Sequence, residues 1–455
     1  MARAKKEAAL TPEERLQAAL VPDWEWPYKL PKNWCWTTVG AINQYVGISA
    51  DPTKAKNKTF ELYSVPSSAD NYPEIVLGAD IGSTKQSVKK GDVLLCKINP
   101  RINRVWKVSK YTDHSLLASS EWIVIRNSGL ISNYLMWCFR SPYFRGYMLS
   151  NVSGVGGSLM RAQPKFVQGY PVPVPPLAEQ QRIVDRIESL FAKLDEAKEK
   201  AQTVVDSFEN RKASILHKAF TGELTAKWRE EHGVGMDSWE KKSVGELCIS
   251  LKYGTAKKSD ASGNVVVLRM GNLQQGEIDW SDLAYSNDPD DIEKYKLFPG
   301  DVLFNRTNSA ALVGKTAIYR GEHPAIYAGY LIKLDYDRDK IIGDYLNYAL
   351  NTLDAKKYCN SVKTDGVNQS NINAKKIGAY SFNVPSIPEQ EKIVSVIQKL
   401  LSKEQQAKEA AEAVLDQIDL MKKSILARAF RGELGTNDPS EESAVELLKR
   451  GLEKK

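Results

Sequence analysis

Apolar residues recur in alternating steps of four and three over residues 177–224, and the same pattern returns over residues 387–434. Matched positions, such as Gln180 and Gln390, differ by 210 throughout, and no gap interrupts the match. A seven-residue apolar repeat sustained over more than four heptads is typical of a coiled-coil seam. The chain therefore contains an internal repeat, and the pattern predicts one long helix in each copy.

The predicted seam is the row of apolar side chains that would face the other helix. In the first helix these residues are Ile183, Ile187, Leu190, Leu194, Ala197, Ala201, Val204, Phe208 and Ile215. In the second they are Ile393, Ile397, Leu400, Ala407, Ala411, Val414, Ile418, Met421 and Ile425. Glu404 is the one polar interruption, and charged residues flank both rows, as expected of a helix that is solvated outside its seam.

The direction of pairing follows from the repeat rather than from the seam. Antiparallel pairing would set Ala197 and Ala201 against Ala407 and Ala411, but parallel pairing would match these alanines as well. Two equivalent halves related by a two-fold axis across the seam require antiparallel helices, which we therefore expect. Each helix would be about 65 Å long at about 1.5 Å per residue.

The remaining sequence forms two globular segments that share an order of short motifs. GDVLLCKIN at residue 91 is answered by GDVLFNRTN at residue 300, and SNYLMWCFRS at 132 by GDYLNYALNT at 343. Short β-like runs bounded by Gly, Pro, Asn and Asp alternate with a helical stretch in both. This predicts an α+β fold with mainly antiparallel or mixed sheets, in which two similar globular domains are separated by an intramolecular antiparallel coiled coil with pseudo-two-fold symmetry.

This organisation predicts seven segments. They are an N-terminal extension (1–30), a first globular domain (31–176), a first helical region (177–224), a linker (225–238), a second globular domain (239–386), a second helical region (387–434) and a C-terminal tail (435–455). The polar, Gly-containing linker corresponds, by the repeat, to the tail combined with the N-terminal extension. We therefore expect the two ends of the chain to lie close together, with a short amphipathic helix in the tail.

Composition places the chain among ordinary globular proteins. Its 455 residues exceed what one core accommodates, and the net charge of +7 permits a polyanionic partner without requiring one. The five cysteines are scattered singly and are expected to be reduced thiols. No apolar run of 18 residues and no signal-peptide pattern is present, so we expect a cytoplasmic protein without a membrane span.

No catalytic or metal-binding constellation emerges from the sequence. The four histidines are dispersed without a metal-ligand spacing, so we expect no metal site. The sequence LVGKT around Lys315 resembles part of a phosphate-binding loop, but Ser309 stands where that loop requires its first glycine. The chain also lacks the [DN]PP[YF] tetrapeptide of adenine methyltransferases. These observations favour a binding protein over an enzyme.

Two polar regions are candidates for DNA contact. Residues 89–110 hold seven basic residues against one acid, and Arg and Asn are the residue types that contact guanine and adenine edges bidentately. In the first globular domain the candidates are Lys97, Asn99, Arg101, Asn103, Arg104, Lys107, Ser158 and Arg161. In the second they are Asn305, Arg306, Thr307, Asn308, Lys363, Asn368, Gln369 and Asn371. At any single position a solvated loop residue is an equal alternative.

The doubled motifs carry a family resemblance. VPPLAEQQRIVDRI followed by SILHKAFTGEL, echoed by VPSIPEQEKIVSVI and SILARAFRGEL, resembles the paired conserved regions of type I restriction–modification specificity subunits. The resemblance covers nearly the whole chain. Ser386 and Pro388 depart from the usual pattern, and the GGSLMR loop of the first domain lacks the glutamine and asparagine of its counterpart.

The resemblance implies a DNA-recognition subunit without catalytic activity of its own. Each globular domain would be a target recognition domain that reads one half of a bipartite, asymmetric site on double-stranded DNA. The helix pair would set the spacer between half-sites and dock two methyltransferase subunits, and two restriction/translocase subunits would complete the complex. S-adenosylmethionine, ATP and Mg²⁺ would be bound by those partners and no cofactor by this chain, in a prokaryotic cytosol with no membrane contact. A coiled-coil adaptor without sequence readout is the alternative.

Overall fold

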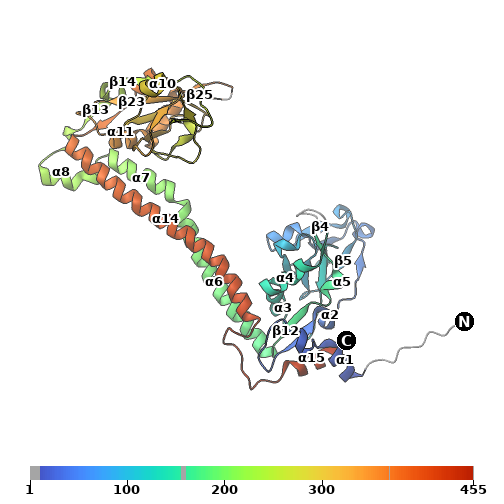
Figure 1. Ribbon diagram of the computed structural model, residues 1–455. Coiled ribbons are helices and arrows are strands. Elements are labelled where there is room, and N and C mark those ends of the chain that lie inside the picture. Colours follow the sequence, from blue (N-terminus) through green and yellow to red (C-terminus); the bar gives the residue numbers. More distant parts are fainter. Residues whose placement is uncertain (1–10, 155–159, 368, 454–455) are drawn as a thin grey trace. The chain divides into compact units, whose positions relative to one another are not determined.

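The computed structural model describes residues 11–154, 160–367 and 369–453 (Figure 1). The chain divides into two compact units: unit 1 comprises Met1–Lys200 and Val414–Lys455, and unit 2 comprises Ala201–Ala413. Each unit contains one globular lobe together with part of both long helices. The mixture of helices and strands that the sequence predicts is confirmed.

The first lobe, in unit 1, is built on a five-stranded sheet and a three-stranded sheet. The larger has the order β2 (Ser49–Ala50), β5 (Lys85–Ser87), β8 (Ser115–Ala118), β3 (Thr59–Tyr63) and β4 (Glu74–Leu77). The smaller has the order β7 (Val105–Lys107), β6 (Val93–Cys96) and β9 (Trp122–Ile125). All these pairs are antiparallel except β3 with β8, so the expectation of mainly antiparallel or mixed sheets is confirmed.

The remaining elements of the first lobe connect its sheets to the long helix. β1 (Cys35–Thr38) pairs with β12 (Pro171–Val174), and a β10–β11 hairpin consists of Val152–Ser153 and Arg161–Ala162. The helices are α2 (Val39–Ile42), α3 (Ser132–Arg140), α4 (Pro142–Ser150) and α5 (Pro164–Val167). The single helical stretch expected near residue 140 is two helices, because Ser141 caps α4 at Phe144 N–H and Pro142 occupies its first turn.

The second lobe, in unit 2, has a four-stranded sheet in the order β14 (Cys248–Tyr253), β23 (Leu331–Tyr336), β19 (Val302–Asn305) and β21 (Thr316–Ile318). A second sheet has the order β18 (Tyr285–Ser286), β15 (Val265–Leu268) and β22 (Ala325–Tyr327). A third has the order β20 (Thr307–Asn308), β25 (Ser370–Asn371) and β24 (Thr364–Asp365). The short pairs are β16 (Leu273–Gln274) with β17 (Glu277–Ile278), and β13 (Glu240–Ser243) with β26 (Ser381–Val384).

Among the described residues, four of the five α-helices of the second lobe follow the order of those in the first, and α10 is additional. The five are α9 (Val244–Leu247), α10 (Pro289–Lys294), α11 (Gly343–Leu350), α12 (Leu353–Val362) and α13 (Ala374–Gly378). The hydroxyl of Tyr134 on α3 donates to Pro173 O, and that of Tyr345 on α11 donates to Asn383 O, both at 2.8 Å. The same helix is therefore tied to the same strand in both lobes, as a duplication requires.

The long helices are α6 (Leu177–Asp206), α7 (Phe208–Phe220) and α14 (Ile387–Ala429). The first predicted helix is thus divided at Ser207, although the hydrogen bonds from Ser207 N–H to Thr203 O and from Arg211 N–H to Ser207 O continue across the division. Beyond each helix lies a glycine with positive φ, Gly222 at 82° and Gly432 at 75°, the conformation in which a glycine commonly ends a helix.

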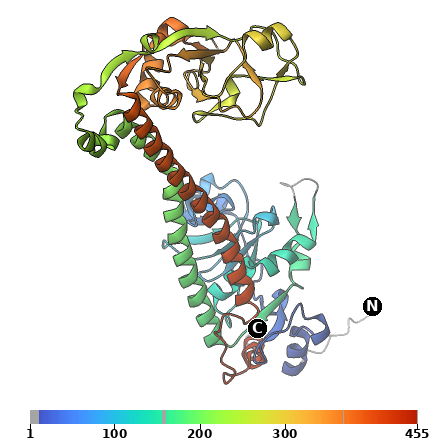
Figure 2. The same ribbon diagram turned by 60° about the vertical axis from the view of Figure 1, so that its left-hand side comes forward.

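Within each unit the long helices run antiparallel. In unit 1 Asp195 forms an ion pair with Lys422 and Lys198 forms one with Asp419, so the numbers rise on one helix as they fall on the other. In unit 2 Arg211 forms an ion pair with Glu404. Figures 1 and 2 both show α14 running beside α6 and α7.

The burial of the predicted seam residues differs between the two helices. Every predicted seam residue of α6 and α7 is buried or half-buried, whereas three on α14 are exposed: Ala407, Val414 and Met421. Their places are taken by Lys408, Leu415 and Lys422, each one residue further on, which are half-buried.

Aromatic partners explain the two lysines in the seam. Lys408 Nζ lies 5.0 Å from the ring centre of Phe208, and Lys422 Nζ lies 5.1 Å from that of Phe191. Their aliphatic stems cover the rings while the ammonium groups remain hydrated. The ion pairs of unit 1 also place Ala197 opposite residues near 420 instead of Ala411, so the predicted alanine pairing is wrong.

The tail and the predicted linker each contain a helix. The tail forms α15 (Ala444–Glu453), which packs against α1 (Pro12–Ala19), and Lys449 on α15 forms an ion pair with Glu13 on α1. The expected proximity of the two ends is therefore confirmed for these described helices. The segment expected to be a linker instead contains α8 (Ala226–His232), because Arg229 is drawn into a buried ion pair with Glu389.

Across the described parts of the chain, none of the helices combines the length and apolar character needed to cross a membrane.

Candidate nucleic-acid interface

In the first lobe the structure brings together the two segments that the sequence marks as DNA contacts. Ile98 forms an antiparallel bridge with Arg161 of the β10–β11 hairpin. Lys97 O accepts a hydrogen bond from Ala162 N–H at 2.9 Å, and Asn99 N–H donates to Met160 O at 2.8 Å. The segment after β6 therefore lies beside a hairpin some sixty residues further along the chain.

The second lobe repeats this arrangement with different side chains. Thr307 on β20 pairs with Asn371 on β25, and Arg306 O accepts from Ile372 N–H at 2.9 Å. The Thr307 hydroxyl also donates to Asn371 Oδ1 at 2.6 Å. The same backbone arrangement carries Lys97, Ile98 and Arg161 in the first lobe. In the second lobe it carries Arg306, Thr307 and Asn371. The two lobes therefore present different side chains at an equivalent place.

The predicted contact residues differ in exposure. Arg101, Arg161 and Gln369 are exposed, and Lys97, Asn99, Asn103, Arg104, Lys107, Arg306, Asn308, Lys363 and Asn371 are half-buried. Asn305 and Thr307 are buried, so their side chains position their neighbours rather than face solvent. Ser158 and Asn368 lie outside the described residues.

Several of the half-buried residues are held by partners within their own lobe. Asn103 Nδ2 donates to Arg140 O at 3.2 Å, and Lys107 Nζ donates to Asn133 Oδ1. Asn99 and Asn103 both have positive φ, 47° and 54°, and so fix the shape of the loop between β6 and β7. The two asparagines therefore determine the backbone conformation of this loop.

Arg306 is held by an aromatic ring and a backbone carbonyl of the second lobe. Its guanidinium carbon lies 4.9 Å from the ring centre of Tyr253, and Nη1 donates to Gly329 O at 3.3 Å. The Tyr253 hydroxyl in turn accepts from Ala374 N–H at 2.9 Å. A guanidinium stacked on an aromatic ring loses little further freedom on binding, which suits it to contact a phosphate or a guanine edge.

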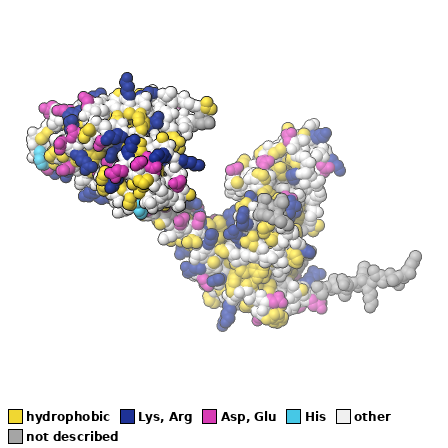
Figure 3. All heavy atoms as spheres, turned by 45° about the horizontal axis from the view of Figure 1, so that its top comes forward, with side chains coloured by type: hydrophobic (Ala, Val, Ile, Leu, Met, Phe, Trp, Pro, Cys, Tyr) yellow, Lys and Arg dark blue, Asp and Glu magenta, His cyan; other side chains and the backbone are white. Residues whose placement is uncertain are grey.

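The surface of each unit mixes charges instead of segregating them. On the face shown in Figure 3, Lys and Arg side chains are interspersed with acidic and hydrophobic ones in both units. Arg161 forms an ion pair with Glu121 at 3.2 Å, and Lys363 forms one with Asp365 at 2.9 Å. These two candidate cations are therefore already paired with carboxylates of their own lobe.

The segment that resembles a phosphate-binding loop has a different structure. Gly314 has φ 91°, but Thr316 begins strand β21, where a phosphate-binding loop would lead into a helix. Lys315 Nζ donates to Gln274 Oε1 at 2.8 Å and so is engaged within the lobe. The segment is part of the connection between two antiparallel strands, β19 and β21.

The cysteines are not arranged for chemistry. All five are free thiols, and all but Cys248 are buried. Burial raises the pKa of Cys35 to about 12, and burial together with a smaller effect of the nearby Asp335 carboxylate raises that of Cys248 to about 12, so neither is a thiolate near neutral pH. Among the described residues no group of three or more His, Cys, Asp or Glu side chains could hold a metal ion.

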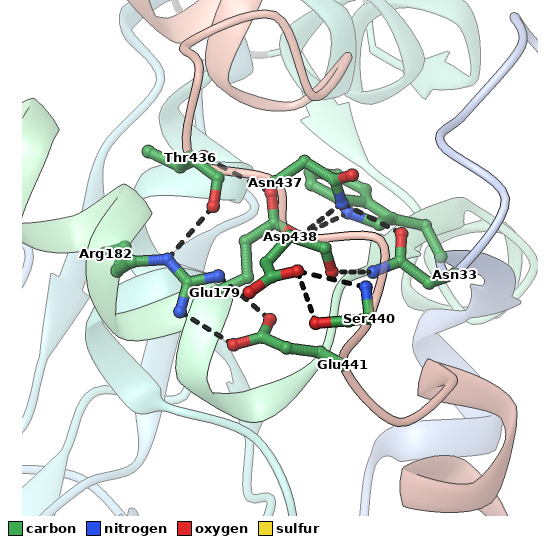
Figure 4. Close-up of polar contacts among 9 residues, drawn as sticks. Asn33, Glu179, Arg182, Thr436, Asn437, Asp438, Ser440 and Glu441 are labelled. Carbon is green, nitrogen blue, oxygen red and sulfur yellow. Dashed lines mark hydrogen bonds and ion pairs between the residues drawn. The ribbon is translucent and has the colours of Figure 1, made fainter.

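The sequence reading missed two buried carboxylates at equivalent places in the helices. Glu179 on α6 accepts from Trp34 Nε1 at 2.7 Å and from Asn437 Nδ2 at 2.8 Å, and Figure 4 shows the tail folded around it. Beside it Arg182 forms a bidentate pair with Glu441 of the tail. Glu179 therefore joins the helix, the first lobe and the C-terminal tail.

Glu389 has the same place on α14. It accepts from Trp239 Nε1 at 3.0 Å, Thr225 Oγ1 at 2.7 Å and Arg229 Nη1 at 2.7 Å. The signal in the sequence was the pair of residues Glu-Gln repeated 210 positions apart. We assigned that repeat to helix formation, whereas its carboxylates anchor the connecting segments.

Comparisons with known proteins agree with this architecture. A family described as "Type I restriction modification DNA specificity domain" matches residues 236–413. The chain is 27% identical over 306 residues to the StySPI specificity subunit of Salmonella potsdam, covering 66% of this chain and 65% of that protein. It is 27% identical over 321 residues to the EcoKI specificity subunit of Escherichia coli K12, covering 68% of each. The match thus spans about two thirds of these relatives.

Solved structures share the fold. The HsdS subunit from Thermoanaerobacter tengcongensis superposes with a TM-score of 0.65 at 22% identity, covering 90% of this chain and all of that one. A chain from a structure concerned with assembly of the type I R-M system has a TM-score of 0.70 at 22% identity and the same coverage.

Proposed function

We propose, from the premise that this chain belongs to the family of type I restriction–modification specificity subunits, that it is the DNA-recognition subunit of such a complex. Each lobe would read one half of a bipartite, asymmetric site on double-stranded DNA. The observation that supports this is that the same pairing of two segments occurs in both lobes with different side chains. They are Lys97 and Arg161 in one lobe and Arg306 and Asn371 in the other. One duplicated scaffold thereby offers two different reading surfaces.

The long helices would form a single intramolecular antiparallel coiled coil with pseudo-two-fold symmetry. The ion pairs Asp195–Lys422 in unit 1 and Arg211–Glu404 in unit 2 support this, because both pair residues whose numbers add to nearly the same value. A common register is what one continuous antiparallel seam requires. The coiled coil would then set the spacer between the half-sites.

The outer face of α14 is the surface we assign to a partner. Met421 is 48% exposed, and Val414, two turns earlier on the same side of the helix, is 40% exposed; Leu420, the neighbour of Met421, is 63% exposed. Neighbouring exposed apolar residues on one helix face favour a protein partner. We assign this face to the two methyltransferase subunits, and two restriction/translocase subunits would complete the complex.

Catalysis would belong to those partners. They would bind S-adenosylmethionine for adenine N6 methylation, and ATP and Mg²⁺ for translocation and restriction, while this chain contributes sequence recognition and no cofactor. Adenine methylation requires the base to be flipped out of the duplex, which needs a protein held at a fixed place on the site. The complex would act on DNA in a prokaryotic cytosol.

The test is to map methylated adenines in the host genome by single-molecule sequencing, with and without the gene for this chain. The proposal expects a bipartite motif that disappears with the gene. A gene-dependent motif that is a continuous palindrome would contradict it, and a coiled-coil adaptor without readout would show no sequence-dependent gel shift.

Exchange of residues 37–175 for the matching segment of another family member tests the independence of the lobes. Only one half of the methylated motif should change, because each lobe has its own sheets and its own set of candidate contact residues. A change in both halves would show that the lobes do not read separately.

A further inference from the structure

A cavity of about 430 Å³ lies within unit 2. Its lining comes from three parts of the chain: α7, α12, and the β16–β17 turn together with the end of the β19–β21 connection. All three belong to the same compact unit, so the cavity does not depend on how the two units are placed. Its volume is in the range of sites that hold small molecules, about 300–1,000 Å³.

Lysines dominate the charge of the cavity lining. Lys212 on α7, Lys315 at the end of the β19–β21 connection and Lys356 on α12 all line it. Glu209 is the one acidic residue among the described residues that do so. Its side chain is exposed, whereas Lys212 and Lys315 are half-buried. The buried charge of the lining is therefore positive.

The three lysines have few acceptors within the chain. Lys315 Nζ donates to Gln274 Oε1 at 2.8 Å, and Lys212 Nζ donates to Gln275 O at 3.4 Å. Over the described residues, Lys356 Nζ has no acceptor, and none of the three lysines forms an ion pair. Because an ammonium group carries three donors, each lysine retains donors for a ligand.

The corresponding lysine in the other half of the chain is neutralised. The counterpart of Lys212, 210 positions further on, is Lys422, which forms an ion pair with Asp195 and lies over the Phe191 ring. Burial, and to a smaller extent repulsion by Lys356, lowers the pKa of Lys212 despite the attraction of nearby carboxylates. An anion in the cavity would offset both of these unfavourable effects on the Lys212 ammonium group.

The rest of the lining indicates what kind of anion fits. Asn351 and Asn360 contribute side-chain amides, and Leu216, Val313 and Leu353 contribute apolar surface. A lysine ammonium group binds phosphate as a point charge, whereas the fork of arginine matches a carboxylate. A phosphate monoester carries a charge of about −1.5 to −2 at neutral pH, which suits three cations beside one exposed carboxylate.

We propose that this cavity binds a small phosphorylated molecule, with its phosphate among the three lysines and its uncharged part against Leu216 and Val313. A free molecule fits better than a phosphate of the DNA backbone, because a duplex is convex and meets side chains that project from a surface. None of the described candidate DNA-contact residues lines the cavity. The site therefore adds a ligand to the proposed recognition function and does not depend on it.

Calorimetric titration of the full chain with pyrophosphate and with adenosine 5′-monophosphate tests the site. Pyrophosphate probes the lysines alone, and the nucleotide adds an uncharged part. Wild type should bind both, and the two should compete for one site. Lys212→Gln and Lys356→Gln should each weaken binding about tenfold, the effect of losing one charge-assisted hydrogen bond. Lys356→Arg should retain binding, because the charge remains.

The matched controls are Lys218→Gln on α7 and Lys357→Gln on α12. Each makes the same change of charge on the same helix, at an exposed residue outside the cavity lining, and should bind like wild type. Thermal unfolding without ligand checks that every variant folds. Pyrophosphate should raise the Tm of wild type and of Lys218→Gln, and should raise that of Lys356→Gln much less.

Three results would overturn the proposal. The first is that wild type binds neither probe. The second is that Lys218→Gln and Lys357→Gln weaken binding as much as the cavity variants, which would indicate general attraction to a basic surface. The third is that neither probe competes with duplex DNA while Lys212→Gln and Lys356→Gln both weaken duplex binding, which would assign the lysines to the DNA backbone. Weakening confined to the cavity variants supports the site.

Discussion

At the scale of single residues, a buried glutamate at equivalent places in the two halves of the chain has different partners. Glu179 and Glu389 are both buried and both accept from a tryptophan indole. Only Glu389 has a buried cation beside it, Arg229, whereas Glu179 is satisfied by neutral donors such as Asn437. The two sites therefore predict different responses to the same substitution.

Glu389→Ala should be the more damaging change. It leaves the Arg229 guanidinium buried without its counterion, which costs about 3–5 kcal/mol of unfolding free energy. Glu179→Ala removes a carboxylate from neutral donors and should cost about 1–3 kcal/mol. Urea unfolding followed by tryptophan fluorescence measures both, with Glu391→Ala, at an exposed position of the same helix, as control. Equal losses at the two sites would contradict this reading.

Glu61 in the first lobe predicts a loss of stability in acid. Its burial raises the pKa, but hydrogen bonds from Tyr111 N–H, the Tyr63 hydroxyl and Thr112 outweigh that effect, so the pKa is lowered overall. A carboxylate with a depressed folded-state pKa stabilises the fold above its unfolded value, about 4.3, and loses that contribution as pH falls through the folded value. The stability difference between wild type and Glu61→Gln should therefore be constant near neutrality and shrink below about pH 4, measured by urea unfolding at several pH values. Asp80→Asn is the exposed control, and a difference that does not vary with pH would refute the assignment.

At the scale of elements, periodicity located the long helices but could not decide which residue fills each place in the seam. The first helix follows the apolar pattern throughout, whereas α14 places Lys408 and Lys422 where the pattern indicated Ala407 and Met421. A lysine is scored as polar, yet its stem covers an aromatic ring whose position depends on the partner helix. The register between two helices depends on contacts with the partner helix, so the periodicity within each helix does not predict it.

The ion pair Arg211–Glu404 offers a test of how the seam is stabilised. By the 210-residue repeat its counterparts are Met421 and Leu194, so the matching positions in the other half carry apolar residue types. Glu404→Leu alone should cost about 1 kcal/mol, because it leaves a half-buried guanidinium unpaired, and adding Arg211→Met should restore or exceed wild-type stability.

A double-mutant cycle in thermal unfolding measures this coupling. The exposed pair Glu196–Lys200 on α6 is the matched control and should show little coupling, as surface ion pairs do. If the stability loss of the double variant equals the sum of the two single losses, the two side chains are not coupled. That result would contradict the view that an apolar pair can replace this ion pair.

At the scale of the whole molecule, the repeat was the most informative feature of the sequence. It predicted the doubled lobe, the antiparallel helices within each unit and the contact between α1 and α15. It could not predict that Asn305 is buried or that the linker contains a helix held by Arg229. Arg229 depends on Glu389, 160 residues away in the sequence, and the burial of Asn305 depends on how its strand packs, so neither leaves a periodic trace.

The proposed role of the helices as a spacer leads to the last prediction. One heptad inserted at matched positions of the first and second helices adds about 10 Å to each at about 1.5 Å per residue. One base pair occupies about 3.4 Å of duplex, so the spacer between half-sites should lengthen by up to about three base pairs while the bases read stay the same. Mapping methylated adenines made by the lengthened chain measures the spacer directly. A heptad inserted in one helix only is the control and should abolish methylation, because it destroys the antiparallel register in which Arg211 meets Glu404. Methylation at the original spacing by the doubly lengthened chain would show that something other than the helices sets the distance.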